Sequence, residues 1–116
     1  MHELSIALSL VDIACDEMSR RPAARVEFVH LRLGTLAGVA KDALLFSFDA
    51  AAAGTLIEGA RLQIEDVPVT VWCDRCAAEQ PLVSVAHRCC PVCSAVTPEI
   101  RQGTELELVG LEVTDA

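Results

Sequence analysis

The stretch CDRCAAEQPLVSVAHRCCPVC, residues 73–93, decides how this chain of 116 residues is organised. It contains two Cys-x-x-Cys pairs with thirteen residues between them, Cys73 with Cys76 and Cys90 with Cys93. At this spacing two tight turns can place four thiolates around one tetrahedral zinc ion. A segment of about twenty residues cannot build its own core, so metal binding would supply the missing stability. The stretch therefore predicts a zinc-ribbon-like module.

Composition and charge restrict the class of protein. Apolar residues make up 53% of the chain, which is typical of a globular protein, yet no apolar run approaches the ~20 residues of a membrane span. The N-terminus lacks the basic leader of a secretory signal, which predicts a cytoplasmic protein. In that reducing compartment cysteines serve as metal ligands more often than as disulfides. The net charge of −8 repels phosphate and argues against nucleic acid as a partner.

Hydrophobic periodicity predicts two helices. The first runs from Glu3 to about Ser19, with an apolar side formed by Leu4, Leu8, Val11, Cys15 and Met18. The second runs from Lys41 to Ala53 and ends at Gly54, which is placed as a C-terminal cap. Its apolar positions are Leu44, Leu45, Phe48 and Ala52.

Alternating apolar residues predict three strands, over residues 25–33, 61–72 and 104–113. The second helix connects the first two strands, and such a crossover makes them parallel if they share a sheet. Pro68 and a change in the alternation predict a bulge in the second strand. The third strand changes phase in the same way, from Leu106 and Leu108 to Val109, Leu111 and Val113.

The second and third strands flank the cysteine stretch. The simplest topology pairs them antiparallel as a long hairpin, from whose end the cysteine module protrudes. We therefore predict an α+β fold, with two helices packed on a small mixed three-stranded sheet and a protruding zinc-ribbon-like module. Residues 1–69 and 101–116 would form the α/β domain, and residues 70–100 the zinc-binding module.

Four thiolates leave zinc no open coordination position, so the predicted zinc is structural. Thiol–disulfide exchange by Cys73-Asp-Arg-Cys76 is a rival hypothesis, but it needs a thiolate at a helix N-terminus, and no helix is predicted after Cys73. Cys15 is predicted to be a small buried core residue. Cys89 is either a free thiol near the site or a fifth ligand that exchanges with Cys90.

The N-terminus offers a second candidate metal site. The α-amine of Met1, the amide nitrogen of His2 and the His2 imidazole can close two small chelate rings around one metal. Nitrogen donors in one plane suit Ni(II) or Cu(II). A histidine at position two is also common on frayed surface termini, so the pattern alone leaves this site undecided.

Taken together, these features resemble the HypA/HybF family of hydrogenase maturation nickel chaperones. The similarity covers nearly the whole chain and includes the opening MHELSIA, the segments LRLGTLAGV, ALLFSFD and EGARLQIED, and both paired-cysteine turns. It implies a nickel metallochaperone that is not an enzyme, with Ni(II) as transient cargo and structural Zn(II). The implied partners are a GTPase of the HypB type and the hydrogenase large subunit, without nucleic acid or membrane. Urease accessory proteins and a homodimer are also compatible with the resemblance.

The resemblance also implies roles for individual residues. His2 would be the principal nickel ligand, with the amine of Met1 and the backbone nitrogen or carboxylate of Glu3 nearby. Cys73, Cys76, Cys90 and Cys93 would bind zinc. Many family members carry an acidic residue where this chain has Ala40, and Asp42 is the nearest substitute. Some members place histidines beside the paired cysteines, which links zinc geometry to pH, whereas this chain has only His87.

One alternative function belongs to another class of protein. A zinc-ribbon interaction or scaffold module without nickel cargo would account for the four paired cysteines equally well. It would leave Met1 and His2 without a function.

Overall fold

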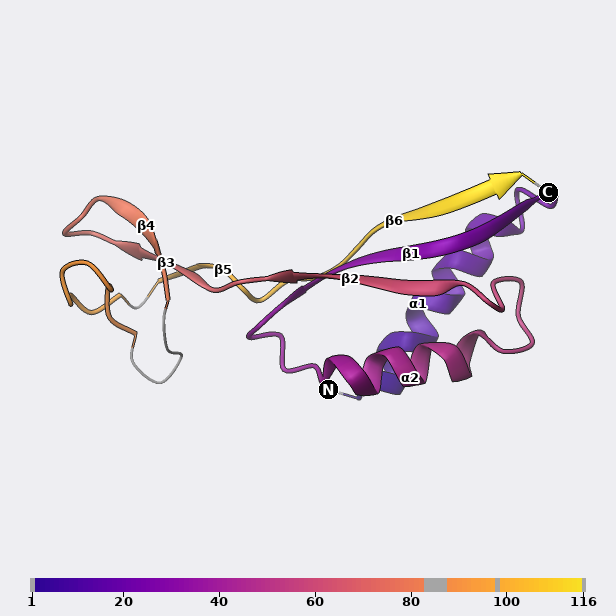
Figure 1. The fold of residues 1–116 in the computed structure, drawn as a ribbon, viewed down its shortest axis with the longest axis horizontal. Coiled ribbons are helices and arrows are strands. Elements are labelled where there is room, and N and C mark those ends of the chain that lie inside the picture. Colours follow the sequence, from indigo (N-terminus) through magenta and orange to yellow (C-terminus); the bar gives the residue numbers. More distant parts are fainter. Residues whose placement is uncertain (1, 83–87, 98, 116) are drawn as a thin grey trace. The chain divides into compact units, whose positions relative to one another are not determined.

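A computed structural model describes residues 2–82, 88–97 and 99–115 of the chain (Figure 1). Met1 and His87 therefore lie outside the described residues. The elements in chain order are α1 (Glu3–Met18), β1 (Ala24–Gly34), α2 (Lys41–Ala52), β2 (Arg61–Val67), β3 (Thr70–Cys73), β4 (Ala78–Pro81), β5 (Ile100–Gln102) and β6 (Leu106–Asp115). No helix within the described ranges is long and apolar enough to cross a membrane.

The chain divides into two compact units. The first consists of Met1–Arg32, Gly38–Glu65 and Glu107–Ala116, and the second of Leu33–Ala37 and Asp66–Leu106. The first unit contains α1, α2 and most of a three-stranded sheet in the order β2-β1-β6. Because α2 connects β1 to β2, these two strands run in the same direction, while β6 runs against β1 (Figure 1). The predicted mixed sheet with a crossover helix is confirmed.

Helix α1 has the predicted span but a different buried face. Its buried residues are Ile6, Ala7, Leu10, Val11, Ala14 and Met18. Leu4 and Leu8, predicted to be on the buried side, are 51% and 47% exposed, and Cys15 is only half-buried. Apolar residues occupy most of the circumference of α1, so periodicity alone does not choose one arc. Helix α1 packs against α2, and the arc that is buried includes the small residues Ala7 and Ala14, both fully buried.

Helix α2 agrees with the prediction. Leu44, Phe48 and Ala52 are buried on one side of the helix, and Leu45 is half-buried. Gly54 follows the helix with φ of +76°, the left-handed conformation in which glycine commonly ends a helix. Apart from Phe46, the large apolar residues of α2 lie on one side of the helix, so their spacing was sufficient to predict which side is buried.

The predicted hairpin between the second and third strands is wrong in the first unit. There β1 lies between β2 and β6, so β2 and β6 do not pair with each other. Strand β1 takes the central position because its side chains Val29, Leu31 and Leu33 are all buried. Val109 was predicted to share a face with Leu111 but is 61% exposed, because the alternation of β6 changes after Gly110.

The predicted strand 61–72 is two strands in different sheets. It is interrupted at Pro68, which has no N–H to donate to a ladder, and resumes as β3 in the second unit. There the sheet has the order β4-β3-β5, and β3 pairs antiparallel with both neighbours. An antiparallel partner for β3 does follow the cysteine stretch, but it is β5, which lies before the predicted strand 104–113, with Val71 opposite Ile100.

Two glycines let the segment Leu33–Ala37 join the second unit. The N–H of Gly34 donates to the carbonyl of Glu105 at 2.7 Å, and that of Leu36 to the carbonyl of Gly103 at 2.7 Å. A Cβ atom on Gly34 would lie 2.2 Å from the carbonyl carbon of Gly103, so no side chain fits there. A Cβ atom on Gly103, whose φ is +119°, would lie 2.9 Å from Cα of Val69, so this position also excludes larger residues.

Candidate metal centre

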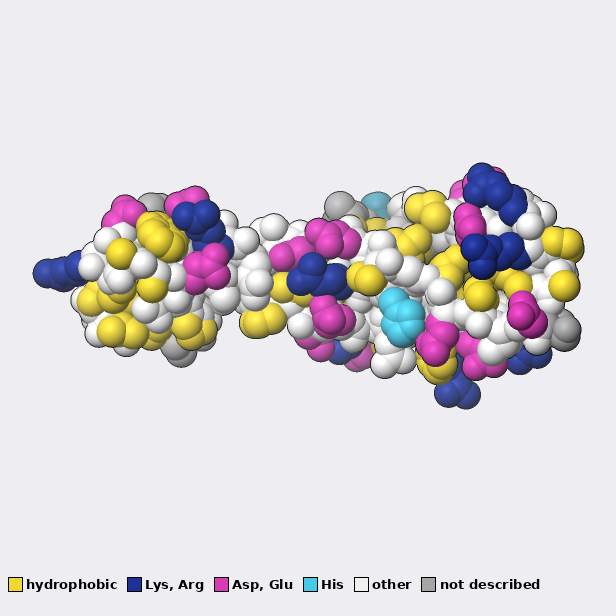
Figure 2. Space-filling view, turned by 90° about the horizontal axis from the view of Figure 1, so that it is seen from above, with side chains coloured by type: hydrophobic (Ala, Val, Ile, Leu, Met, Phe, Trp, Pro, Cys, Tyr) yellow, Lys and Arg dark blue, Asp and Glu magenta, His cyan; other side chains and the backbone are white. Residues whose placement is uncertain are grey.

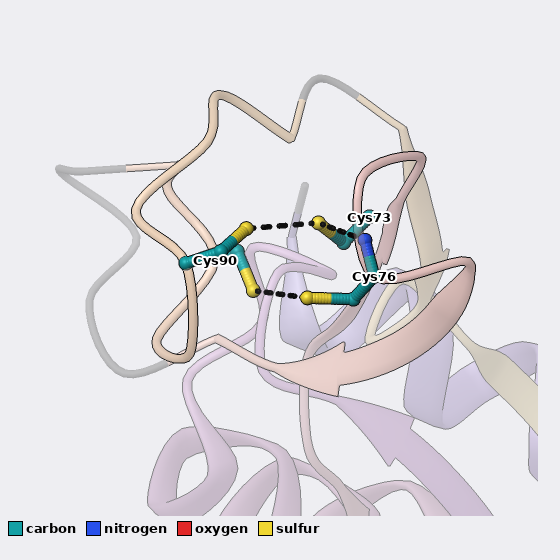
Figure 3. A group of neighbouring side chains, drawn as sticks. Cys73, Cys76 and Cys90 are labelled. Atoms are coloured by element: carbon teal, nitrogen blue, oxygen red, sulfur yellow. Dashed lines mark hydrogen bonds between the residues drawn. The ribbon is translucent and has the colours of Figure 1, made fainter.

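The four paired cysteines of the second unit form one cluster (Figure 3). Cys73 ends β3, Cys76 lies in the turn before β4, and Cys90 and Cys93 lie in a second turn. Their four Sγ atoms are all within 4.8 Å of one another. The Sγ atoms of Cys73 and Cys93 are 3.5 Å apart, and those of Cys76 and Cys90 are 3.8 Å apart. The structure thus brings together all four residues that the spacing predicted.

The sulfur positions fit a tetrahedral zinc ion. Zinc–sulfur bonds of about 2.3 Å give a tetrahedron with sulfur–sulfur edges of about 3.8 Å. The separations of 3.5 Å and 3.8 Å are close to this edge, and both greatly exceed the ~2.05 Å of a disulfide bond. Among the described residues, this is the one group of three or more His, Cys, Asp or Glu side chains placed to share a metal ion. Four thiolates and no other donor suit Zn(II).

In each cysteine turn a backbone N–H points to the sulfur of the first cysteine, although the donor lies three positions after it in the first turn and two positions after it in the second. In the first, the N–H of Cys76 points to Sγ of Cys73 at 3.4 Å, and in the second the N–H of Val92 points to Sγ of Cys90 at 3.4 Å. The residue that follows each second cysteine is left-handed, with φ of 51° at Ala77 and 62° at Ser94. These are the only non-glycine residues with positive φ in the described part of the chain. The left-handed backbone is strained at a non-glycine residue, and in these turns it accompanies the arrangement in which both sulfurs of a pair point to one place.

The thiols of the cluster differ in their pKa values. Burial by itself would raise the pKa of Cys90, but the backbone N–H groups of Cys93 and Val92 stabilise the thiolate and lower the pKa to about 7. A hydrogen bond with the Cys93 thiol, followed by burial, raises the pKa of Cys76 to about 12. Four negative charges within 4.8 Å would repel one another, so full deprotonation of the cluster requires a cation.

Backbone hydrogen bonds hold the second turn closed. The N–H of Cys90 donates to Ala95 at 2.8 Å, and that of Ser94 donates to Cys90 at 2.9 Å. Thr97 is fully buried, and both its N–H and its Oγ1 donate to the carbonyl of Arg88, at 2.8 Å and 3.0 Å. Sequence reasoning missed Thr97, for which the sequence carries no motif, and the strain at Ala77 and Ser94.

The two remaining cysteines lie outside the four-sulfur cluster. Cys89 is exposed and faces Val96 across a single antiparallel bridge, on a strand-like segment where neighbouring side chains point to opposite sides. This placement matches the predicted free thiol near the site and does not favour a fifth ligand. Cys15 on α1 was predicted to be a small buried core residue but is only half-buried.

The N-terminal candidate site lies where α1 begins. His2 is the N-cap residue of α1; it is exposed, and its side chain makes no capping hydrogen bond. The Glu3 carboxylate accepts the backbone N–H of Ala40 at 3.1 Å, and this bond is the main reason that its pKa is lowered. Asp42 is exposed in the first turn of α2. Met1 is not among the described residues, so the complete chelate remains a prediction.

The surface charges are mixed. On the face shown in Figure 2, lysine and arginine side chains stand among aspartates and glutamates, and this face presents no continuous basic area. Arg20, for example, contacts Asp16 at 3.0 Å and Glu17 at 2.9 Å, and Arg32 contacts Glu65 at 2.8 Å. Such a surface does not favour binding to a phosphate backbone.

Comparison with known proteins places these features in context. Residues 1–113 match the family described as "HypA: Hydrogenase/urease nickel incorporation, metallochaperone, hypA". A hydrogenase maturation factor HypA from Roseiflexus sp. (strain RS-1) is 54% identical over 115 residues, which cover 99% of this chain and 94% of the relative. The hydrogenase maturation factor HypA of Chloroflexus aurantiacus (strain ATCC 29366 / DSM 635 / J-10-fl) is 51% identical, covering 97% of this chain and 98% of the relative.

Two solved structures share the fold. The solution structure of the Ni metallochaperone HypA from Helicobacter pylori is 26% identical, with a TM-score of 0.64 and full coverage of both chains. A second solution structure, described as HypA protein, is 25% identical, with a TM-score of 0.70, covering 98% of this chain and 97% of that one.

Proposed function

This chain belongs to the HypA family of hydrogenase and urease nickel-incorporation metallochaperones, and we propose that it binds Ni(II) at its N-terminus and delivers it for [NiFe]-hydrogenase maturation. The observation that carries the proposal is the family match from residue 1 to residue 113, which includes the Met1-His2-Glu3 opening. The proposed activity is binding and transfer, without the making or breaking of covalent bonds.

The nickel donors in this proposal are the amine of Met1, the amide nitrogen and imidazole of His2, and Glu3. The exposed His2 side chain supports this role, because it makes no capping hydrogen bond that metal binding would have to break. Asp42, in the first turn of α2, is a further candidate donor. An open chelate at a chain end allows a partner to replace the nickel ligands one at a time, which suits a cargo protein.

Zinc has a separate, structural role in the proposal. Cys73, Cys76, Cys90 and Cys93 would hold one Zn(II), and the fit of their sulfur separations to a tetrahedron supports this assignment. Zinc with four thiolates cross-links the two turns and offers no site for substrate. In functional terms we divide the chain into a nickel-binding α/β domain, residues 1–69 and 101–116, and a zinc-binding module, residues 70–100.

The partners in this proposal follow from the family. We propose a GTPase of the HypB type and the hydrogenase large subunit as partners in nickel delivery. Urease accessory proteins are a further candidate because the family description includes urease, and self-association as a homodimer is compatible with the proposal. A cytoplasmic location is supported by the cluster of four cysteines, because paired cysteines in a reducing compartment serve as metal ligands more often than as disulfides.

Nickel titration of three untagged proteins tests the nickel site. The native chain should bind one nickel ion, whereas His2→Ala and a chain extended by two residues before Met1 should both lose this binding. Intact mass must show that Met1 is retained, because its removal would move the amine to His2. Zinc content should remain one ion per chain in all three.

Equal nickel binding by all three proteins would overturn the proposal. Release of the native protein from nickel resin at negligible imidazole, with zinc retained, would favour the alternative of a zinc-ribbon interaction module without nickel cargo. A purified protein without zinc that cycles with a reductant would instead favour thiol–disulfide exchange.

A further inference from the structure

One hydrogen bond joins the beginning of α1 to the beginning of α2. Glu3 Oε2 accepts the N–H of Ala40 at 3.1 Å, across 37 positions of sequence. Ala40 is the N-cap residue of α2, with an extended backbone, and its carbonyl accepts the N–H of Leu44 at 2.9 Å. The Ala40 side chain makes no capping hydrogen bond. The start of α2 therefore takes a hydrogen-bond acceptor from another helix.

This contact reproduces half of a capping box. In that motif a Glu or Gln at the third helical position accepts the N–H of the N-cap residue. The third position of α2 is Ala43, whose methyl group cannot accept a hydrogen bond. Glu3 supplies the missing carboxylate from α1, where it also lies in the first turn of its own helix. Both helix starts carry partial positive charge, which favours a carboxylate between them.

The same contact restrains the segment that contains the proposed nickel donors. His2 immediately precedes Glu3, and its carbonyl accepts the N–H of Ile6 at 3.3 Å. The peptide group between His2 and Glu3 is thus held on one side by the first turn of α1 and on the other by Ala40. A chain terminus without such contacts is usually mobile, and ordering mobile groups on binding costs affinity.

We propose that Glu3 is a positioning residue, whose carboxylate caps α2 and thereby preorganises the N-terminal nickel chelate, and that this carboxylate does not bind the metal. This inference rests on the proposed function, since it concerns the same nickel-binding segment. It decides between the two roles that family resemblance leaves open for Glu3, its carboxylate and its backbone nitrogen. The structure assigns the carboxylate to Ala40 and leaves the backbone nitrogen as the candidate donor.

The test separates capping of α2 from positioning of the chelate. Glu3→Ala removes both, and adding Ala43→Glu supplies a carboxylate to the Ala40 N–H from within α2. Ala43 is exposed, so the longer side chain needs no space in the core. Ala43→Met in the Glu3→Ala background is the matched control, because methionine has similar length and no comparable acceptor. Three properties are measured: hydrogen exchange of the Ala40 amide, the melting temperature and the nickel dissociation constant.

In Glu3→Ala the Ala40 amide should exchange faster, the melting temperature should fall by a few degrees and the nickel dissociation constant should rise by about three- to tenfold. Adding Ala43→Glu should restore Ala40 protection and the melting temperature while the nickel dissociation constant stays raised. Adding Ala43→Met should restore none of the three. The nickel-loaded native protein and Glu3→Ala should show the same number of oxygen donors by X-ray absorption.

Three results would overturn the inference. These are unchanged Ala40 exchange in Glu3→Ala, full recovery of nickel affinity on adding Ala43→Glu, and loss of one oxygen donor from the nickel in Glu3→Ala. Absence of nickel binding by the native protein would overturn the proposed function and the positioning role together. In that case Ala40 exchange would still decide whether Glu3 caps α2, so the two failures are distinguishable.

Discussion

Replacing the left-handed residues of the two cysteine turns by glycine should strengthen zinc binding. Ala77 and Ser94 have φ of 51° and 62°, and both side chains are exposed, so Ala77→Gly and Ser94→Gly remove strain without removing packing. The left-handed conformation costs a non-glycine residue about 1–2 kcal/mol, and the extra freedom of glycine in the unfolded chain costs about 0.4–1 kcal/mol. The net gain should be roughly 0.5–1 kcal/mol for each substitution.

Zinc affinity reports this gain because metal binding and folding of the module are coupled. A gain of that size corresponds to a roughly two- to fivefold tighter zinc complex for each variant, and roughly five- to thirtyfold for the double variant if the two turns act independently. The assay is equilibrium competition with a zinc-binding dye at fixed pH.

Ala78→Gly is the matched control for these variants. Ala78 follows Ala77 directly, begins β4 opposite Cys73, and is not left-handed, so glycine there should weaken zinc retention. If Ala77→Gly and Ser94→Gly weakened zinc binding as much as Ala78→Gly does, the strain attributed to the two turns would be refuted.

Three further predictions concern the stability of the fold. Phe48 is fully buried, so Phe48→Ala should lower the free energy of unfolding by about 3–5 kcal/mol, measured with denaturant. Phe46 on the same helix is 77% exposed, so Phe46→Ala should change it by no more than about 0.5 kcal/mol. Equal costs would contradict the placement of Phe48 in the core of the first unit. Gly34→Ala should destabilise the fold by more than about 2 kcal/mol in the same assay. A Cβ atom on Gly110 would meet no atom within 4 Å, so Gly110→Ala should be neutral or stabilising by up to about 1 kcal/mol. A neutral Gly34→Ala would contradict the close backbone approach. In the folded protein the pKa of the Glu3 carboxyl lies below its ordinary value of 4.5, so the contribution of Glu3 to stability is present above pH 4.5 and is lost as the pH falls through the folded pKa. The melting temperature of Glu3→Ala should therefore depend less on pH in this acid range than that of the native protein. An unchanged pH profile would count against the Ala40 contact.

Much of the metal centre was predictable from sequence because its geometry is local. Two cysteines separated by two residues lie in one tight turn, and the turn directs both sulfurs toward one point. The partner pair had to be brought in by folding, but its identical pattern identified it. The left-handed backbone at Ala77 and Ser94 was not predictable, because neither residue is a glycine that would signal it.

The fold was predictable in its elements and less so in their pairing. Helix α2 and the strands follow the spacing of apolar residues, which is set by backbone geometry within each segment. Strand order is different, because the position of β1 between β2 and β6 depends on which strand buries the most apolar surface. The predicted hairpin was therefore wrong in the first sheet, and in the second sheet β3 pairs with β5, a strand that was not predicted.

By itself the sequence determined the four-cysteine pattern, the two helices and the Met1-His2-Glu3 opening, because each of these depends on residues within a few positions of one another. Only the tertiary structure decided which arc of α1 is buried, where β1 lies in its sheet, and that Glu3 caps α2 through Ala40. These features are contacts between residues far apart in the chain, and such contacts form only when the packing of the whole unit selects one arrangement among several that local patterns allow.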